Sequence, residues 1–317
     1  EQKVRPEELP FLYFVDLVDE FLLDVPTLRE VPREAQSQLA ALTQGVCDAL
    51  LGAGRASAEE ERAGKLLLLL HRLTLWAPRG AQARGRRGPH GRAAQQSRVV
   101  RDRIAAAWRG EWEQLLQEAR QRGGEAAQRR TGGRLEGEAL AREVLRRTAL
   151  REYSKAASLL GSPGMAAPTP AVEEVLEGLL EKRDEPRVPP GRGSGPGPGV
   201  SRKHLREALR RASRVAGPGP SGSRATHWAV VLQVPTALES LAKVADRVAA
   251  ADLPEEVVAG LAAVCLHPLR KKPSGVRPVG AGEALRRVVG RALLAGRKAV
   301  LAEGVGRHQL GAGLIAG

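Results

Sequence analysis

A group of cations gathers around one short turn in the last quarter of the sequence. The segment Leu266–Val279 reads L-H-P-L-R-K-K-P-S-G-V-R-P-V. Two short runs meet at Pro-Ser-Gly, and this pattern is typical of a β-hairpin. Lys271, Lys272 and Arg277 would then lie near its tip. Phosphate is the expected counterpart, because arginine can bind it with two parallel N–H donors and lysine supplies a point charge.

The two predicted strands each contain a proline, Pro268 in the first and Pro278 in the second. Proline has no N–H to donate to the ladder of a central strand. We therefore expect short strands at the edge of any sheet.

The cations continue past the predicted hairpin. Between His267 and Arg307, ten lysines and arginines stand against two acids. A solvated helix face normally mixes both signs to form i,i+4 pairs, so this excess favours a surface that follows a phosphate backbone. The net charge of +14 for the whole chain agrees with a nucleic-acid partner. The candidate contacts are Arg270, Arg286, Arg287, Arg291 and Arg297.

The elements that must position these cations are mostly helical. Apolar spacing predicts helices over residues 7–23, 33–51, 59–76, 99–121, 135–160, 234–250, 252–266 and 282–302, and one beginning at Pro170. A basic helix is also expected after Ser201, and it either lies on a phosphate backbone or is simply amphipathic. Asp252, followed by Glu255, predicts a capping box at the start of the seventh of these helices. Residues 78–98 are rich in arginine and have no apolar period, which predicts a basic loop.

The sequence also predicts a division into two regions. Residues 184–200 are mostly proline and glycine and read as a semi-extended linker. We expect a helical N-terminal region over 1–183 and a second region over 201–317. The expected fold class is mainly α with one small basic β-hairpin.

Several other chemistries have no support in the sequence. The six histidines are scattered without the spacing of metal ligands, and neither a P-loop nor a G-x-S-x-G motif occurs. Cys47 and Cys265 are far apart and read as small buried hydrophobes, which fits a reducing intracellular location, nuclear or cytoplasmic. The apolar run Leu66–Leu70 is too short to cross a bilayer, so no membrane partner is expected.

The hairpin segment resembles part of a known family. L-H-P-L-R-K-K-P-S-G-V-R-P-V-G-A-G-E-A-L-R-R-V-V-G-R-A-L, followed by H-Q-L-G-A-G, is similar to the fingers region of reverse transcriptases from non-long-terminal-repeat retroelements. In that family a basic K-K-x-x-G-x-R-P hairpin precedes a helix that begins G-E-x-L-R-R, and a Q-x-G segment follows. Upstream, G-P-S-G at 219–222 and S-K-A-A-S-L-L-G-S-P-G-M-A-A-P at 154–168 resemble two further segments in the family's order.

The resemblance implies the fingers part of a right-hand polymerase, an α+β structure. The complete protein would be an RNA-directed DNA polymerase, a nucleotidyltransferase that binds RNA and DNA as template and primer and takes a nucleoside triphosphate. By resemblance, Arg277 and one of Lys271 and Lys272 would contact the phosphates of the incoming nucleotide. Gln309 and Gly311 would lie near the nucleotide and the template strand.

The resemblance also implies where the metal chemistry lies. The family's palm aspartates follow the Q-x-G segment, and the sequence stops at Gly317 before either could occur. We therefore expect no catalytic residue and no metal ligand in these 317 residues, with Mg²⁺ bound only by the complete polymerase. Two alternatives stay open: a non-catalytic helical nucleic-acid-binding protein, such as a decayed retroelement copy, and a helical scaffold with disordered basic arms.

Overall fold

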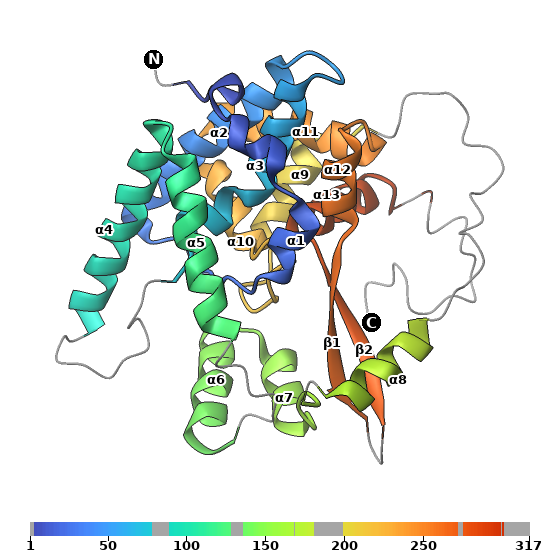
Figure 1. Ribbon diagram of the computed structural model, residues 1–317. Coiled ribbons are helices and arrows are strands. Elements are labelled where there is room, and N and C mark those ends of the chain that lie inside the picture. Colours follow the sequence, from blue (N-terminus) through green and yellow to red (C-terminus); the bar gives the residue numbers. More distant parts are fainter. Residues whose placement is uncertain are drawn as a thin grey trace.

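The computed structural model describes residues 3–77, 89–127, 136–167, 169–180, 199–271, 275–298 and 300, with helical backbone alone at 89–92, 124–127 and 180. Over these residues the protein is mainly helical and has one two-stranded antiparallel hairpin, as the sequence predicts (Figure 1). The helices are α1 Leu17–Leu22, α2 Gln36–Gly52, α3 Ala58–Leu75, α4 Pro89–Trp108, α5 Trp112–Ala127, α6 Gly137–Ala149, α7 Tyr153–Gly161, α8 Pro170–Leu180, α9 Arg202–Arg210, α10 Ala225–Trp228, α11 Pro235–Ala250, α12 Glu255–Ala262 and α13 Ala284–Gly296. The strands are β1 Val264–Arg270 and β2 Val276–Gly282, and short 3-10 turns occur at Pro6–Glu8, Pro10–Phe14, Arg33–Ala35 and Ala229–Gln233.

Helix α3 is the central element of the fold. Its run of five leucines, Leu66–Leu70, is buried all round the helix, which is the pattern of a helix enclosed by other elements. Ser57 begins the helix by accepting a hydrogen bond from the Glu60 backbone N–H at 3.1 Å. Helices α2, α4, α5 and α12 pack against it.

The hydrophobic core joins both predicted regions. It contains Val4 and Leu12 near one end of the chain and Leu285 and Val289 near the other. Helix α2 packs on α11, and α3 packs on α12, so elements before and after the predicted linker cover one another. Residues 181–198, which hold most of that linker, lie outside the described residues, and the division of the chain at this point stays a prediction.

The single helix predicted over residues 7–23 is wrong. Two 3-10 turns, each with a proline in its first turn, occupy residues 6–14, and only Leu17–Leu22 is α-helical. Asp16 interrupts the pattern because its carboxylate accepts from the backbone N–H groups of Val18 at 2.7 Å and Asp19 at 3.0 Å. It therefore caps α1 instead of lying along a longer helix.

Five other local predictions are also corrected. The single helices predicted over 99–121 and 135–160 are each divided into two helices, with breaks at residues 109–111 and 150–152. The capping box at Asp252 is absent: α12 begins after Pro254, and the Asp252 carboxylate pairs with Arg55 at 2.8 Å. The helix predicted to reach Leu266 ends at Ala262 because β1 begins two residues later. Of the basic loop predicted over 78–98, residues 89–98 belong to α4, and residues 78–88 lie outside the described part of the chain.

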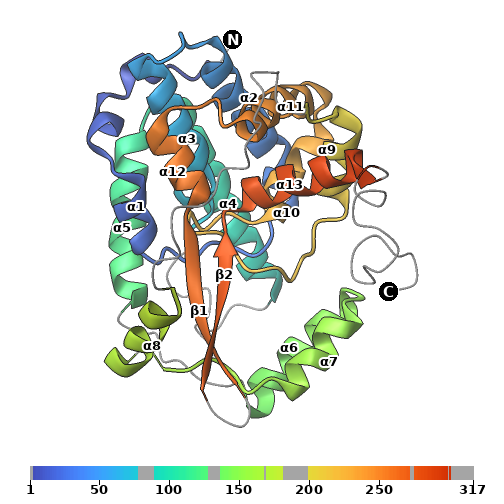
Figure 2. The ribbon, with the colours of Figure 1, turned by 90° about the vertical axis from the view of Figure 1, so that its right-hand side faces the viewer.

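The β1–β2 hairpin extends away from the helical body (Figure 1), and the view turned by 90° shows the same projection (Figure 2). Helices α6, α7 and α8 lie at the level of its far half in both views, and α8 contacts β2. Throughout the described ranges, no helix combines the length and apolar character needed to cross a membrane.

Two buried histidines, His71 on α3 and His227 on α10, lie beside each other with their ring centroids 5.3 Å apart. His71 Nδ1 is 3.0 Å from Ser223 Oγ, and its ring meets the Trp228 ring edge-on at 4.5 Å. His227 Nε2 donates to the Leu28 carbonyl at 2.8 Å, while its Nδ1 accepts from the Arg224 N–H at 3.2 Å. Burial lowers the pKa of His227 to about 3 and that of His71 well below its usual value of 6.5.

This pair makes the fold sensitive to acid. As the pH falls below 6.5, the unfolded chain protonates His71 and His227 while the folded chain keeps both rings neutral. The contribution of the two rings to the free energy of unfolding is therefore complete above pH 6.5. It falls as the pH drops toward 3, by up to about 1.4 kcal/mol per pH unit for each ring. Burial raises the pKa of Glu283, which acts in the opposite direction but involves one group against two.

Urea unfolding at neutral and at mildly acidic pH measures this dependence. We expect a lower free energy of unfolding in acid, and a reduced pH dependence in a His227→Asn variant, which has no proton to take up. Equal unfolding midpoints at the two pH values for the natural chain would contradict the burial of two neutral rings.

Candidate nucleic-acid interface

The register of the hairpin explains its two prolines. Pro268 and Pro278 stand directly opposite each other, with Leu269 opposite Arg277 and Arg270 opposite Val276. In antiparallel strands, paired residues alternate between those that bond to each other and those whose N–H and C=O groups point outward. The Pro268 carbonyl points outward, since it accepts from Ala166 N at 2.8 Å. The prolines therefore form a non-hydrogen-bonded pair, a position where the ladder needs no N–H from either residue.

The same register determines on which face of the hairpin each cation near its tip lies. Lys271 N bonds to the Gly275 carbonyl at 2.9 Å, which continues the ladder beyond Arg270. Because side chains alternate across a strand and paired residues share a face, Lys271 and Arg277 lie on one face and Arg270 lies on the other. All three side chains are exposed, and none pairs with a described residue. Lys272 lies outside the described residues.

The free edge of β1 is covered by a segment from the N-terminal region. Gly164 O accepts from Arg270 N at 3.0 Å, and Met165 forms a bridge with Leu269. These residues belong to S-P-G-M-A-A-P, one of the segments on which the family resemblance depends. This edge of β1 therefore cannot pair with another chain, which leaves the faces of the hairpin and the outer edge of β2.

The base of the hairpin is fixed by a buried carboxylate. Glu283 is fully buried, accepts from Ala284 N at 2.8 Å as the cap of α13, and accepts from Ser221 N at 3.2 Å. Gly219 lies so close that a Cβ there would stand 2.6 Å from Glu283 Oε2. The G-P-S-G turn and the start of G-E-A-L-R-R are therefore one packed junction, although 62 residues separate Ser221 from Glu283.

The arginines predicted on α13 do not share one environment. Arg287 is partly buried, where burial lowers its pKa, and its Nη2 donates to Gly217 O at 2.9 Å. Arg286 is exposed and donates to Ala262 O at 3.1 Å. Arg291 and Arg297 are exposed, and neither pairs with a described residue. Arg291 and Arg297 are thus free to meet a ligand, whereas Arg286 and Arg287 also hold the protein together.

Gln309 and Gly311 lie outside the described residues, so their predicted place near a nucleotide stays a prediction.

Helix α9 is the basic helix that the sequence predicts after Ser201, and it adds exposed cations to the candidate contacts. It packs side by side with α13 (Figure 2). A Cβ at Gly296 of α13 would stand 3.0 Å from His204 Nδ1 of α9. Leu205 and Leu209 are buried while the cations on the other side of the helix are exposed. These exposed residues are Arg202, Lys203, Arg206 and Arg210. The sequence indicates this cationic surface, because the helix carries a single acid, Glu207. That acid pairs with Arg211 at 2.7 Å.

A half-buried arginine lies between the junction and α6. Arg224 Nη1 donates to Ala216 O at 2.9 Å, but its buried Nε has no hydrogen-bond partner in the described structure. Burial and the neighbouring cations Arg29, Arg146 and Arg287 lower the pKa of Arg224 to about 10. The Glu143 carboxylate pairs with Arg29 at 2.9 Å and with Arg146 at 2.6 Å, so the positive charge of this cluster is partly balanced.

A cavity of about 650 Å³ lies at the base of the hairpin, between residues 21–27, 218–224 and 264–267. Its walls are mostly apolar and include Phe21, Leu22, Pro218 and Val264, with Arg72 and Arg224 as the cations. Lys271 and Arg277 do not line it. The cations of the tip therefore stand on an open face and not in this cavity.

Over the described ranges, no group of three or more histidine, cysteine, aspartate or glutamate side chains is arranged to hold a metal ion. The interface described so far is made of cations and backbone groups. Such a set can neutralise phosphate, but metal-assisted nucleotidyl transfer needs carboxylates as well.

Comparisons with protein-family models, with curated proteins and with solved structures found no match for this chain.

Proposed function

We propose that this chain is the N-terminal and fingers part of an RNA-directed DNA polymerase, where it binds template and primer and the phosphates of the incoming nucleotide. The observation that carries the proposal is the common face of Lys271 and Arg277 on a projecting hairpin. A lysine and an arginine two positions apart across a ladder can neutralise one triphosphate together. The basic helices α9 and α13 would lie along the sugar-phosphate backbone of the nucleic acid.

The way the resembling segments meet supports this reading. The connector at 164–166 pairs with β1, and the G-P-S-G turn bonds to Glu283 at the start of α13. Segments that resemble one family in sequence order thus contact one another in space. A helical scaffold with basic arms would not require these contacts.

A pair of variants within the hairpin tests the nucleotide contact. We expect Arg277→Ala to weaken binding of a magnesium–nucleoside triphosphate by about tenfold or more, because a charge-assisted hydrogen bond contributes roughly 1.5–3 kcal/mol. Arg270→Ala removes the same charge from the opposite face and should change the affinity by less than about threefold. Equilibrium titration of the nucleotide in the presence of a primer–template measures both.

Equal losses in the two variants would show that the hairpin contributes only general positive charge. That result would favour the alternative function, a non-catalytic nucleic-acid-binding protein.

A further inference from the structure

Helix α1 and the turn before it expose apolar side chains to water. Phe14 is 83% exposed, Leu22 78%, Tyr13 63% and Val18 47%. The Tyr13 and Phe14 rings meet edge-on with their centroids 5.3 Å apart, and Val18 and Leu22 share one face of α1 because they are four residues apart. Single exposed apolar residues are common on protein surfaces, whereas several together mark interaction sites.

The same part of the chain is acidic, although the protein as a whole carries a charge of +14. Residues 6–24 contain six acids and neither lysine nor arginine. Helix α12, which packs beside α1, adds two acids and no cation (Figure 2). Asp16, Asp19 and Glu255 are exposed, and none of them pairs with a cation among the described residues. We call these three carboxylates and the four exposed apolar side chains the α1 surface.

An apolar recess adjoins the α1 surface. Leu22 also lines the cavity of about 650 Å³ at the base of the hairpin, together with Phe21 and Val264. Val264 is itself 44% exposed. A side chain that binds on Leu22 can therefore continue into this recess, and anchors of this kind supply most of the affinity of protein interfaces.

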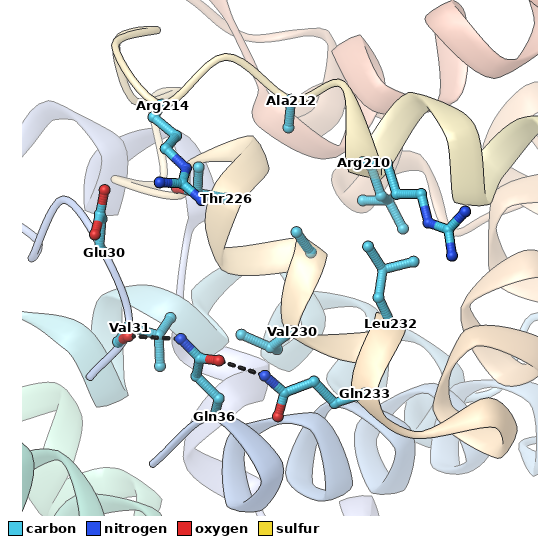
Figure 3. A pocket seen from close by; sticks show the side chains of 12 residues that line it. Glu30, Val31, Gln36, Arg210, Ala212, Arg214, Thr226, Val230, Leu232 and Gln233 are labelled. Carbon is cyan, nitrogen blue, oxygen red and sulfur yellow. Dashed lines mark hydrogen bonds between the residues drawn. The ribbon is translucent and has the colours of Figure 1, made fainter. Parts of the chain in front are cut away.

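The second cavity of the protein, of about 360 Å³, is cationic instead (Figure 3). Figure 3 shows Arg210 and Arg214 on opposite sides of it, and Glu30 is the one acid among the described residues that line it. A basic partner is therefore repelled from this cavity and attracted to the α1 surface.

We propose that the α1 surface binds a basic amphipathic helix of a partner protein. The apolar side of that helix covers Phe14, Val18 and Leu22, and its lysines or arginines pair with Asp19 and Glu255. Nucleic acid and anionic lipid do not fit, because both carry the same sign of charge as these carboxylates. In Figure 2, α1 and the basic helices α9 and α13 lie on opposite sides of the helical body, so this partner does not compete with the nucleic-acid interface.

Two synthetic helical peptides with the same leucines test the charge of the partner. One carries lysines at its polar positions, and the other carries glutamates. General attraction to a chain of charge +14 acts only on the glutamate peptide, so binding of the lysine peptide requires an acidic surface. Fluorescence anisotropy of each labelled peptide measures its affinity for the full chain.

A double variant of the α1 surface locates the binding site. We expect Phe14→Ser with Leu22→Ser to weaken the lysine peptide by about tenfold or more and to leave the glutamate peptide unchanged. The control is Leu145→Ser with Leu160→Ser on α6 and α7, where the side chains are 68% and 55% exposed, and its effect on the lysine peptide should be less than about threefold. All four side chains are exposed, so both variants should fold, and thermal unfolding verifies this.

A second variant tests the carboxylates alone. Asp19→Asn with Glu255→Gln keeps every apolar contact, so it should weaken the lysine peptide by about threefold or more and reduce the salt dependence of its binding.

Three results would overturn the proposal. The lysine peptide does not bind, or it loses equal affinity in the α1 variant and the control. The natural chain sediments as a dimer and Phe14→Ser with Leu22→Ser as a monomer, which assigns the surface to a second copy. The natural chain sediments with phosphatidylcholine vesicles and the same variant does not, which assigns it to a membrane. Failure of the proposed function looks different, because RNA binding is then absent while the lysine peptide still binds.

Discussion

Replacing Arg72 by methionine is expected to destabilise the protein by about 3–5 kcal/mol, the cost of removing one member of a buried charged network. Arg72 lies on α3 and is 1% exposed. Its guanidinium donates to Leu23 O at 2.7 Å, to Ser221 O at 3.3 Å and to the Glu20 carbonyl. One side chain thus joins α1, α3 and the G-P-S-G turn. Methionine of similar length fills the space but leaves these carbonyls buried without donors.

The matched control for Arg72 is Arg98→Met on α4. Arg98 is 79% exposed and its ion pair with Asp102 spans 3.8 Å, so its loss should change stability by less than about 0.5 kcal/mol. The free energy of unfolding in guanidinium chloride measures both variants. A cost below about 1 kcal/mol for Arg72→Met would mean that the carbonyls find other donors and that Arg72 does not fix the turn.

Gly219→Ala is expected to have the second largest effect, a loss of about 2–3 kcal/mol through overpacking. A Cβ at this position would stand 2.8 Å from Ala284 N and 2.9 Å from Glu283 Cα, both backbone atoms of the start of α13. A flexible side chain could give way, but the first turn of a packed helix cannot. The substitution therefore separates the G-P-S-G turn from α13 and moves the base of the hairpin.

Gly217→Ala provides the control two residues away. A Cβ there meets nothing within 4 Å, so stability should stay within about 0.5 kcal/mol of the natural chain. Thermal unfolding separates the two variants, and RNA affinity should fall only for Gly219→Ala. Equal melting temperatures for both variants would show that α13 can shift without cost.

The parts of the fold that the sequence predicts are those with local signals. The Pro-Ser-Gly turn between two strands and the apolar period of α2, α3 and α11 both act over a few residues, and the structure confirms the hairpin and these helices. The helix over 7–23 fails for a local reason as well. Pro10 has no N–H to continue a helix through this point, and the Asp16 carboxylate binds the backbone N–H groups of Val18 and Asp19.

The contacts that position the candidate site had no such signal. Arg72 reads as one more cation at the end of a leucine-rich helix, and its burial depends on Leu23 and Ser221, which are distant in sequence. The bond from Ser221 to Glu283 and the pairing of Met165 with Leu269 are likewise long-range. The charged residues in the sequence indicate on their own which side chains could contact phosphate. Only the register shows that Arg270 and Arg277 lie on opposite faces.

We expect this chain to bind nucleic acid through its unpaired cations. The salt dependence of its affinity for a primer–template tests this most directly. If about six phosphates are contacted, the logarithm of the affinity should fall with the logarithm of salt at a slope of about −0.7 to −0.9 per phosphate. A flat response, or no binding at low salt, would contradict the account and leave a helical scaffold with basic arms.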